Sequence, residues 1–294
     1  KLKRECKLAT YEHMKIGVIG TGTMGNGIAQ AFAQGGYPVV MKDLSDELLQ
    51  KAVENIDNSL SRLVAKEKLN EADKQQILAR IATTLSYEDF NDCGLIVEAI
   101  AENIELKKKV FRELDETCPP GTILATNSSS LSITEIAACT RRPEKVIGMH
   151  FFNPVPVLKL VEVIRGQLTA DSVFDSVSGI AKNIGKVPVT VNEAPGFLVN
   201  RLLIPMINEG IGALAEGVAS KEEIDEAMKL GAGHPIGPLA LADLIGLDVC
   251  LAILEVLHHE FGDDKYRPHP LLRKMVRANL LGRKTGTGFY DYQK

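Results

Sequence analysis

The chain lacks any apolar run of the roughly eighteen residues that a helix needs to span a lipid bilayer, so it is not expected to cross a membrane. It also lacks a strong charge of either sign. The formal net charge is −4, so no basic field recruits nucleic acid or a membrane surface. We therefore expect neither a nucleic acid nor a membrane as a partner.

Cysteine is scarce as well. The five cysteines are scattered and form no C-x-x-C pair, which is typical of reduced thiols, and we expect a cytoplasmic protein. Cysteine and histidine nowhere share the spacing of metal ligands, so no metal site is expected. Residues 1–13 lack the apolar segment of a secretory signal. We interpret them as an added leader or a short natural extension, because the chain reads naturally from Met14.

What remains is an ordinary globular composition. The 294 residues, 45% of them hydrophobic, suffice for one large domain or two medium ones. Short apolar runs alternate with amphipathic stretches up to residue 191, which predicts an α/β fold: a mostly parallel, doubly wound Rossmann-type sheet covered on both faces. The expected strands are 15–20, 38–41, 95–99, 122–126, 146–150, 158–164 and 187–191, and the helices between them are 23–35, 105–117, one from 133, and 171–184.

Two regions depart from this alternation. Residues 46–68 and 71–81 carry apolar residues at helical spacing, and they predict a helical hairpin inserted into the sheet domain, with a surface for a second ligand. After residue 192 only helices are expected, namely 195–215 with Pro195 in its first turn, 221–229, 239–261 and 271–279. We therefore predict a sheet domain over 14–193 and an all-helical C-terminal domain over 194–294.

The segment Gly20-Thr-Gly22-Thr-Met-Gly25 fits the pattern G-x-G-x-x-G, follows an expected strand and opens an expected helix. In dinucleotide sites the first glycine permits the tight turn and the second lets the pyrophosphate approach the backbone. The third glycine allows close packing of helix and strand. The phosphates then meet the N–H groups at the start of the helix.

Asp43 ends the next expected strand, where a carboxylate accepts hydrogen bonds from ribose hydroxyls and repels a 2′-phosphate. We therefore predict NAD rather than NADP as the cofactor, with Lys42 as a neighbouring cation that works against this preference. The predicted cofactor site also includes Thr23 and Met24. The alternatives are a flavodoxin-like glycine turn that binds no dinucleotide, and an FAD site.

A candidate pair for proton transfer lies in the middle of the chain. The segment Gly148-Met-His-Phe-Phe-Asn-Pro154 places His150 at a strand end, and Glu162 follows twelve residues later on the next expected strand. Histidine titrates near neutrality, and a carboxylate beside it orients one ring nitrogen and favours the imidazolium. The pair indicates hydride transfer coupled to proton transfer. The alternative is a core histidine with satisfied hydrogen bonds and a surface glutamate.

Further polar residues follow the same logic. The segment Asn127-Ser-Ser-Ser130 comes after an expected strand, at the edge where ligands bind in open α/β sheets. Serine and asparagine are also favoured helix caps, so the segment predicts a ligand contact, a cap or both. Asn200 lies inside an expected helix, where its side chain needs a partner. It either binds a substrate oxygen or faces its neighbours and solvent.

Four long segments occur in order between Met14 and the C-terminus, and with them the chain resembles the 3-hydroxyacyl-CoA dehydrogenase family, in the form of its short bacterial 3-hydroxybutyryl-CoA members. The resemblance implies an NAD-binding Rossmann domain and a helical domain that forms a homodimer. It also implies interconversion of an L-3-hydroxyacyl-CoA and a 3-ketoacyl-CoA. The segments are GTGTMGNGIAQAFA, GMHFFNPVPVLKLVEVI, NEAPGFLVNRLL and GHPIGPLALADLIGLD.

The resemblance also implies residue roles. His150 is implied as the acid–base group, Glu162 as its partner, and Ser129 and Asn200 as residues that hold the reacting oxygens. The implied cofactor contacts beyond the glycine turn are Glu102, Lys107, Asn127, Ser129, Asn153 and Lys284. The implied CoA contacts on the first helix of the hairpin are Ser59 and Lys66.

Two other functions fit the same fold, because a fold alone does not fix a substrate. One is a sibling NAD-dependent dehydrogenase that acts on a free hydroxy acid or sugar acid. The other is a non-catalytic NAD-binding structural protein. The helix with Ser59 and Lys66 favours a CoA substrate, and the presence of all four implied reaction residues favours an enzyme.

Overall fold

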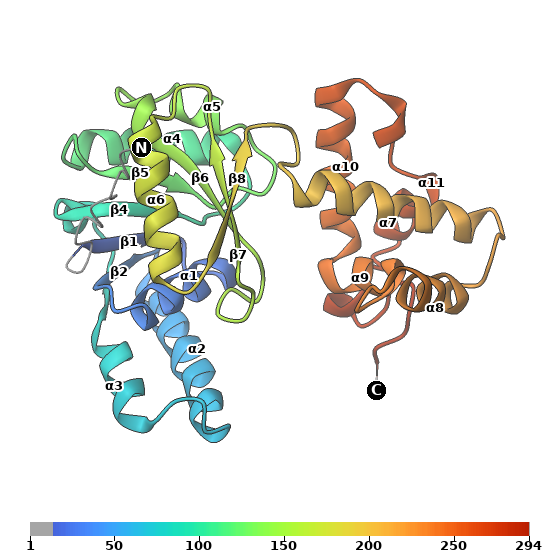
Figure 1. The fold of residues 1–294 in the computed structure, drawn as a ribbon, viewed down its shortest axis with the longest axis horizontal. Coiled ribbons are helices and arrows are strands. Elements are labelled where there is room, and N and C mark those ends of the chain that lie inside the picture. The colour runs from blue at the N-terminus through green and yellow to red at the C-terminus, as the bar shows by residue number, and fades with distance from the viewer. Residues whose placement is uncertain (1–13, 294) are drawn as a thin grey trace, which may run out of the picture. The chain divides into compact units, whose positions relative to one another are not determined.

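The computed structural model describes residues 14–293, so the interpretation of residues 1–13 lies outside the described part of the chain. The chain divides into two compact units. The first ends at Glu193 and the second begins at Ala194. Figure 1 shows a sheet-containing unit and a helical unit.

The first unit is built on one eight-stranded sheet in the order β3-β2-β1-β4-β5-β6-β7-β8. Its neighbouring strands are parallel except for β6 and β7, which are antiparallel. The predicted mostly parallel Rossmann-type sheet is therefore confirmed. The strands are β1 Lys15–Ile19, β2 Val39–Lys42, β3 Ile81–Thr84, β4 Cys93–Glu98, β5 Ile123–Thr126, β6 Val146–Phe151, β7 Leu160–Arg165 and β8 Val187–Asn192.

Helices cover both faces of this sheet. Helices α1 (Thr23–Gln34) and α6 (Asp171–Asn183) share one apolar core with Ile147 and Met149 of β6. A Cβ added at Gly148 would meet Ile133 of α5 (Ile133–Ala137), so α5 lies on the opposite face, because side chains alternate along a strand. His150 shares this face with Gly148. Helix α4 (Ile104–Thr117) joins β4 to β5.

The predicted helical hairpin follows β2, and it leads into β3. Helix α2 (Asp46–Ala65) is capped by Ser45, whose side chain accepts a hydrogen bond from the Leu48 N–H, and α3 (Glu71–Ala79) returns toward the sheet. Lys74 of α3 lies 2.8 Å from Asp57 and ties the two helices together. In Figure 1 the hairpin projects away from the strands.

Strand β3 is an element that the sequence reading missed. Residues 71–81 were expected to be helical throughout, but α3 ends at Ala79 and Ile81 pairs with Val39. The strand has four residues and a single neighbouring strand, and its pattern is half exposed. A segment this short carries too little periodicity to be separated from the end of a helix.

The second unit contains only helices in its described part, apart from isolated bridges near the C-terminus. Its core comes mainly from α7, α9 and α10, through residues such as Ile204, Leu239 and Leu254. None of the helices within residues 14–293 is both long and apolar enough to cross a membrane. The helices are α7 Val199–Ala215, α8 Lys221–Ala232, α9 Pro238–Ile245, α10 Leu247–Phe261 and α11 Pro270–Arg277.

Two predictions for the helical unit were wrong. Pro195 is not in the first turn of a helix, because Gly196 (φ 71°) and Phe197 (φ 52°) adopt left-handed backbone conformations and α7 begins only at Val199. The expected helix 239–261 is two helices. Gly246 separates α9 from α10 with φ 104°, a conformation that residues with a Cβ rarely adopt.

Candidate active site

The turn between β1 and α1 contains three glycines of the pattern. Two of them are closely packed against backbone atoms, and the third has free space beside it. Gly20 has φ 84°, and a Cβ there would lie 2.7 Å from the Ala99 carbonyl oxygen. A Cβ at Gly25 would lie 1.7 Å from the Gly20 carbonyl oxygen, whereas a Cβ at Gly22 would meet nothing within 4 Å. The open backbone at Gly22, beside the first N–H groups of α1, suits the approach of a pyrophosphate.

Asp43 is held beside this turn. Its Oδ2 accepts hydrogen bonds from the Thr21 N–H (2.7 Å) and hydroxyl (2.6 Å), and its Oδ1 accepts from the Leu44 N–H (2.8 Å). Lys42 is buried, and its Nζ lies 4.2 Å from the centre of the Tyr87 ring. The Lys42 ammonium is therefore engaged with an aromatic face, and Asp43 is the charge presented next to the glycine turn.

His150 and Glu162 are directly opposite each other on the antiparallel strands β6 and β7. The His150 Nδ1 and the Glu162 Oε2 are 2.7 Å apart, and the two residues are 6% and 0% exposed. Glu162 is not at the surface, so the alternative of a surface glutamate is wrong. With Nδ1 donating to the carboxylate, Nε2 is the ring nitrogen suited to exchange a proton with a substrate.

The serine segment gathers around Glu102. Glu102 Oε1 accepts hydrogen bonds from the Ser128 hydroxyl (2.6 Å), the Ser129 N–H (2.8 Å) and hydroxyl (3.1 Å), and the Ser130 N–H (3.1 Å). Burial favours the neutral carboxyl, but the Lys107 charge and these hydrogen bonds outweigh it and lower the pKa of Glu102. Glu102 is therefore an anion that fixes the backbone on which Ser129 is carried.

Asn127 and Lys107 join the same cluster. The Asn127 side-chain oxygen accepts from the Phe151 N–H at 2.9 Å, which ties the serine segment to the strand of His150. Lys107 Nζ lies 2.6 Å from Glu98 Oε1 and 3.5 Å from Glu102 Oε2. The structure thus brings Glu102, Lys107, Asn127 and Ser129 together at the carboxyl ends of β4 and β5.

Two carboxylates of this region were not predicted from the sequence as site residues. Glu98 is fully buried and pairs with Lys107. Glu193 accepts hydrogen bonds from the Ser132 hydroxyl (2.6 Å) and the Thr134 N–H (3.1 Å) at the start of α5. The position of Glu98 at the end of an apolar run is a signal that could have found it. Glu193 contacts residues some sixty positions earlier. It lies in the segment NEAPGFLVNRLL, but nothing in its local spacing indicates that contact.

The other predicted residues lie outside this cluster and their roles stay predictions. Asn153 is exposed just after β6, and Ser59 and Lys66 are near the end of α2. Asn200 and Lys284 belong to the second unit, where Asn200 is largely buried and Lys284 Nζ lies 2.5 Å from the Asp248 carboxylate.

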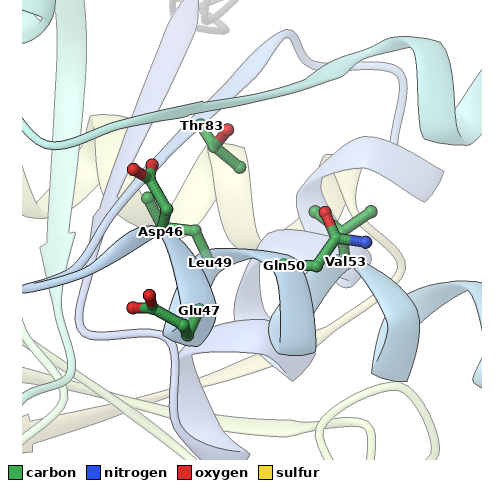
Figure 2. A pocket seen from close by; sticks show the side chains of 6 residues that line it. All are labelled: Asp46, Glu47, Leu49, Gln50, Val53 and Thr83. Carbon is green, nitrogen blue, oxygen red and sulfur yellow. The ribbon is translucent and has the colours of Figure 1, made fainter.

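A pocket of about 370 Å³ lies between the start of α2 and β3, and none of the predicted site residues lines it. Figure 2 shows Asp46 and Glu47 projecting from the first turn of α2, with Thr83 across from them on β3. The lining includes two carboxylates and no cationic side chain. A dinucleotide pyrophosphate would be repelled there, so the glycine turn is the better cofactor site.

A mostly parallel sheet with an open glycine turn, an acid at the end of β2 and a buried histidine–glutamate pair defines an NAD-type dehydrogenase. Residues 15–194 match the model of the 3-hydroxyacyl-CoA dehydrogenase NAD-binding domain, and residues 196–292 match the C-terminal domain of the same family. The chain belongs to the 3-hydroxyacyl-CoA dehydrogenase family. The predicted family and the predicted cofactor, NAD, are confirmed.

Individual relatives match over nearly their whole length. A 3-hydroxybutyryl-CoA dehydrogenase of Clostridioides difficile is 62% identical over 281 residues, which cover 96% of this chain and 100% of the relative. The mitochondrial hydroxyacyl-coenzyme A dehydrogenase of Homo sapiens is 44% identical, with 95% and 91% covered. The crystal structure of (S)-3-hydroxybutyryl-CoA dehydrogenase from Ralstonia eutropha superposes with a TM-score of 0.93 at 55% identity, with 96% and 100% covered.

Proposed function

We propose that the chain interconverts L-3-hydroxybutyryl-CoA and acetoacetyl-CoA with NAD(H). The observation that carries the proposal is the buried His150–Glu162 pair, with 2.7 Å between Nδ1 and Oε2. Relatives at 62% and 55% identity bear the name 3-hydroxybutyryl-CoA dehydrogenase, and they support this choice of substrate.

The proposed roles follow from the chemistry of each side chain. In the oxidation, the C3 hydroxyl proton passes to His150 Nε2 as the hydride leaves C3, and Glu162 stabilises the imidazolium that forms. When bound, NAD⁺ supplies the hydride acceptor. In the reduction, the imidazolium returns the proton to the carbonyl oxygen. We assign Ser129 and Asn200 to hold that oxygen, and Ser59 and Lys66 to contact the CoA part.

Initial rates of NADH oxidation test the proposal, with acetoacetyl-CoA as substrate and with NADPH and free acetoacetate as matched controls. We expect rapid turnover that requires both NADH and the thioester. Faster turnover of the free acid would instead support a sibling dehydrogenase. Binding of NADH without turnover of any keto substrate would support the non-catalytic alternative.

Asp43→Asn is expected to weaken the preference for NADH over NADPH. Two like charges about 4 Å apart near a protein surface repel by roughly 1–4 kcal/mol, so we expect the ratio of kcat/KM values to fall about tenfold or more. The amide oxygen still accepts from Thr21, which preserves the turn. The control is Asp46→Asn, which removes a charge from the same segment outside the Asp43 contacts. An unchanged ratio in Asp43→Asn would refute the assignment.

The proposal includes a homodimer formed through the helical unit and a cytoplasmic location. Exposed apolar residues of that unit, among them Leu202, Val218 and Leu230, support the first, and the free cysteines Cys93 and Cys118 support the second. Sedimentation velocity on the purified chain checks the dimer, and a monomer at micromolar concentration would refute it.

A further inference from the structure

Lys186 is a buried lysine immediately before β8, only 8% exposed. Its Nζ donates hydrogen bonds to two backbone carbonyl oxygens, those of Val155 and, at 2.8 Å, Leu158. Within residues 14–293, no carboxylate forms an ion pair with it. Burial lowers the pKa of Lys186, and no neighbouring charge opposes that effect.

Burial of the Lys186 ammonium opposes folding rather than favouring it. An ammonium removed from water is unfavourable unless a carboxylate or several hydrogen bonds replace the lost solvent. At Lys186 the replacement consists of carbonyl groups from a single loop, residues 152–159, which joins β6 to β7. The hydrogen bonds of Lys186 therefore act on the conformation of that loop.

The loop begins two residues after His150, the proposed acid–base residue. The Phe152 ring centre is 4.5 Å from that of His150. Val155 is 2% exposed and packs on α1, where a Cβ at Gly27 would lie 3.0 Å from the Val155 Cβ. The loop thus runs from the His150 ring to the helix that starts at the glycine turn, and Asn153 lies between these two contacts.

We propose that Lys186 is a positioning residue for the reaction: it holds loop 152–159 so that Phe152 stays against His150 and Val155 stays on α1. The inference rests on the proposed function for its kinetic part. The strand pairing supports it, because the Val187 N–H donates to the Lys159 carbonyl at 2.7 Å and fixes the loop end beside Lys186. Lys186 then restrains the middle of the loop, which the strands do not reach.

The test is Lys186→Met, which keeps the length and apolar volume of the side chain and removes the charge and the donors. We expect the melting temperature to stay at the wild-type value or to rise, because a buried charge is replaced by an apolar group. We expect kcat for acetoacetyl-CoA to fall about tenfold, since small misplacements of reacting groups cost this much or more. Amide hydrogen exchange in loop 152–159 should become about tenfold faster.

Two further variants sharpen the test. Lys182→Met removes an exposed lysine of the same segment and is expected to leave kcat, exchange and melting temperature unchanged. Lys186→Gln retains N–H donors without the charge and is expected to recover part of the lost kcat. A merely structural lysine would give the opposite pattern in Lys186→Met, a lower melting temperature with wild-type kcat, and that pattern would overturn the proposal.

The exchange measurement separates this proposal from the proposed function. If the wild-type chain does not reduce acetoacetyl-CoA, the proposed function fails, and loop exchange still decides whether Lys186 holds the loop. Faster exchange confined to residues 152–159 supports the restraint. Exchange in Lys186→Met equal to wild type overturns it, whatever the kinetics.

Discussion

His150→Gln is expected to lower kcat for acetoacetyl-CoA reduction about 10²- to 10⁴-fold, the range that a general acid or base usually contributes. Glutamine still donates a hydrogen bond toward Glu162, so the strand pairing and the burial of the carboxylate are expected to persist. The glutamine amide, however, does not titrate near neutrality, so it cannot exchange a proton with a substrate oxygen as the histidine Nε2 does. The KM for NADH should change little, because the glycine turn is untouched.

The matched variant is Glu162→Gln, which leaves the imidazole in place and removes the charge that stabilises its protonated form. We expect a smaller loss of kcat than in His150→Gln. Circular dichroism and thermal melting establish that both variants are folded. A folded His150→Gln protein with wild-type kcat would remove His150 from the mechanism, and a larger loss in Glu162→Gln than in His150→Gln would reverse the two roles.

Gly25→Ala is expected to have the largest effect on the sheet unit. The new Cβ would lie 1.7 Å from the Gly20 carbonyl oxygen, a backbone atom that cannot rotate away. Either α1 moves from β1 or the turn unfolds. Overpacking of this kind usually costs about 1–3 kcal/mol and occasionally more. We expect a lower melting temperature and no measurable NADH binding in a fluorescence titration.

Gly22→Ala is the control for this prediction, because its Cβ would meet no protein atom within 4 Å. The melting temperature should stay at the wild-type value. The methyl group would nevertheless occupy the open backbone where a pyrophosphate approaches, so NADH affinity should fall. Wild-type NADH affinity in Gly22→Ala would argue against cofactor binding at this turn, and wild-type stability in Gly25→Ala would contradict the packing.

The sequence predicted the helices and strands in which the spacing of apolar residues follows one clear pattern. Strands such as 15–20 and helices such as 171–184 were anticipated within a few residues, because buried parallel strands and amphipathic helices leave strong patterns. The errors in the helical unit occurred where one backbone conformation overrides the pattern. Gly246 lies within a continuous apolar stretch and still separates α9 from α10, and the left-handed Phe197 delays α7.

Some residues of the candidate site could be predicted from the sequence and others could not. The glycine turn and Asp43 are marked by fixed local spacing, so the sequence could indicate them. The contact between His150 and Glu162 depends on the antiparallel pairing of β6 and β7, which the sequence reading did not specify. Lys186 bonds to the loop 152–159, and Glu193 bonds to Ser132 and Thr134 at the start of α5. Both contacts join residues far apart in the chain, so only the folded structure reveals them.

In the hairpin of β6 and β7, the strands hold the acid–base pair and the loop 152–159 lies beside it. These two parts can change independently in sequence. The spacing of the His150–Glu162 pair is set by strand register, since the two residues face each other across one rung of the ladder. The loop between them lies outside that register. Insertions or replacements within residues 152–159 can therefore reshape what surrounds the imidazole while its carboxylate partner stays in place. The groups around the imidazole can therefore change while the strand register that sets its distance to the carboxylate is kept.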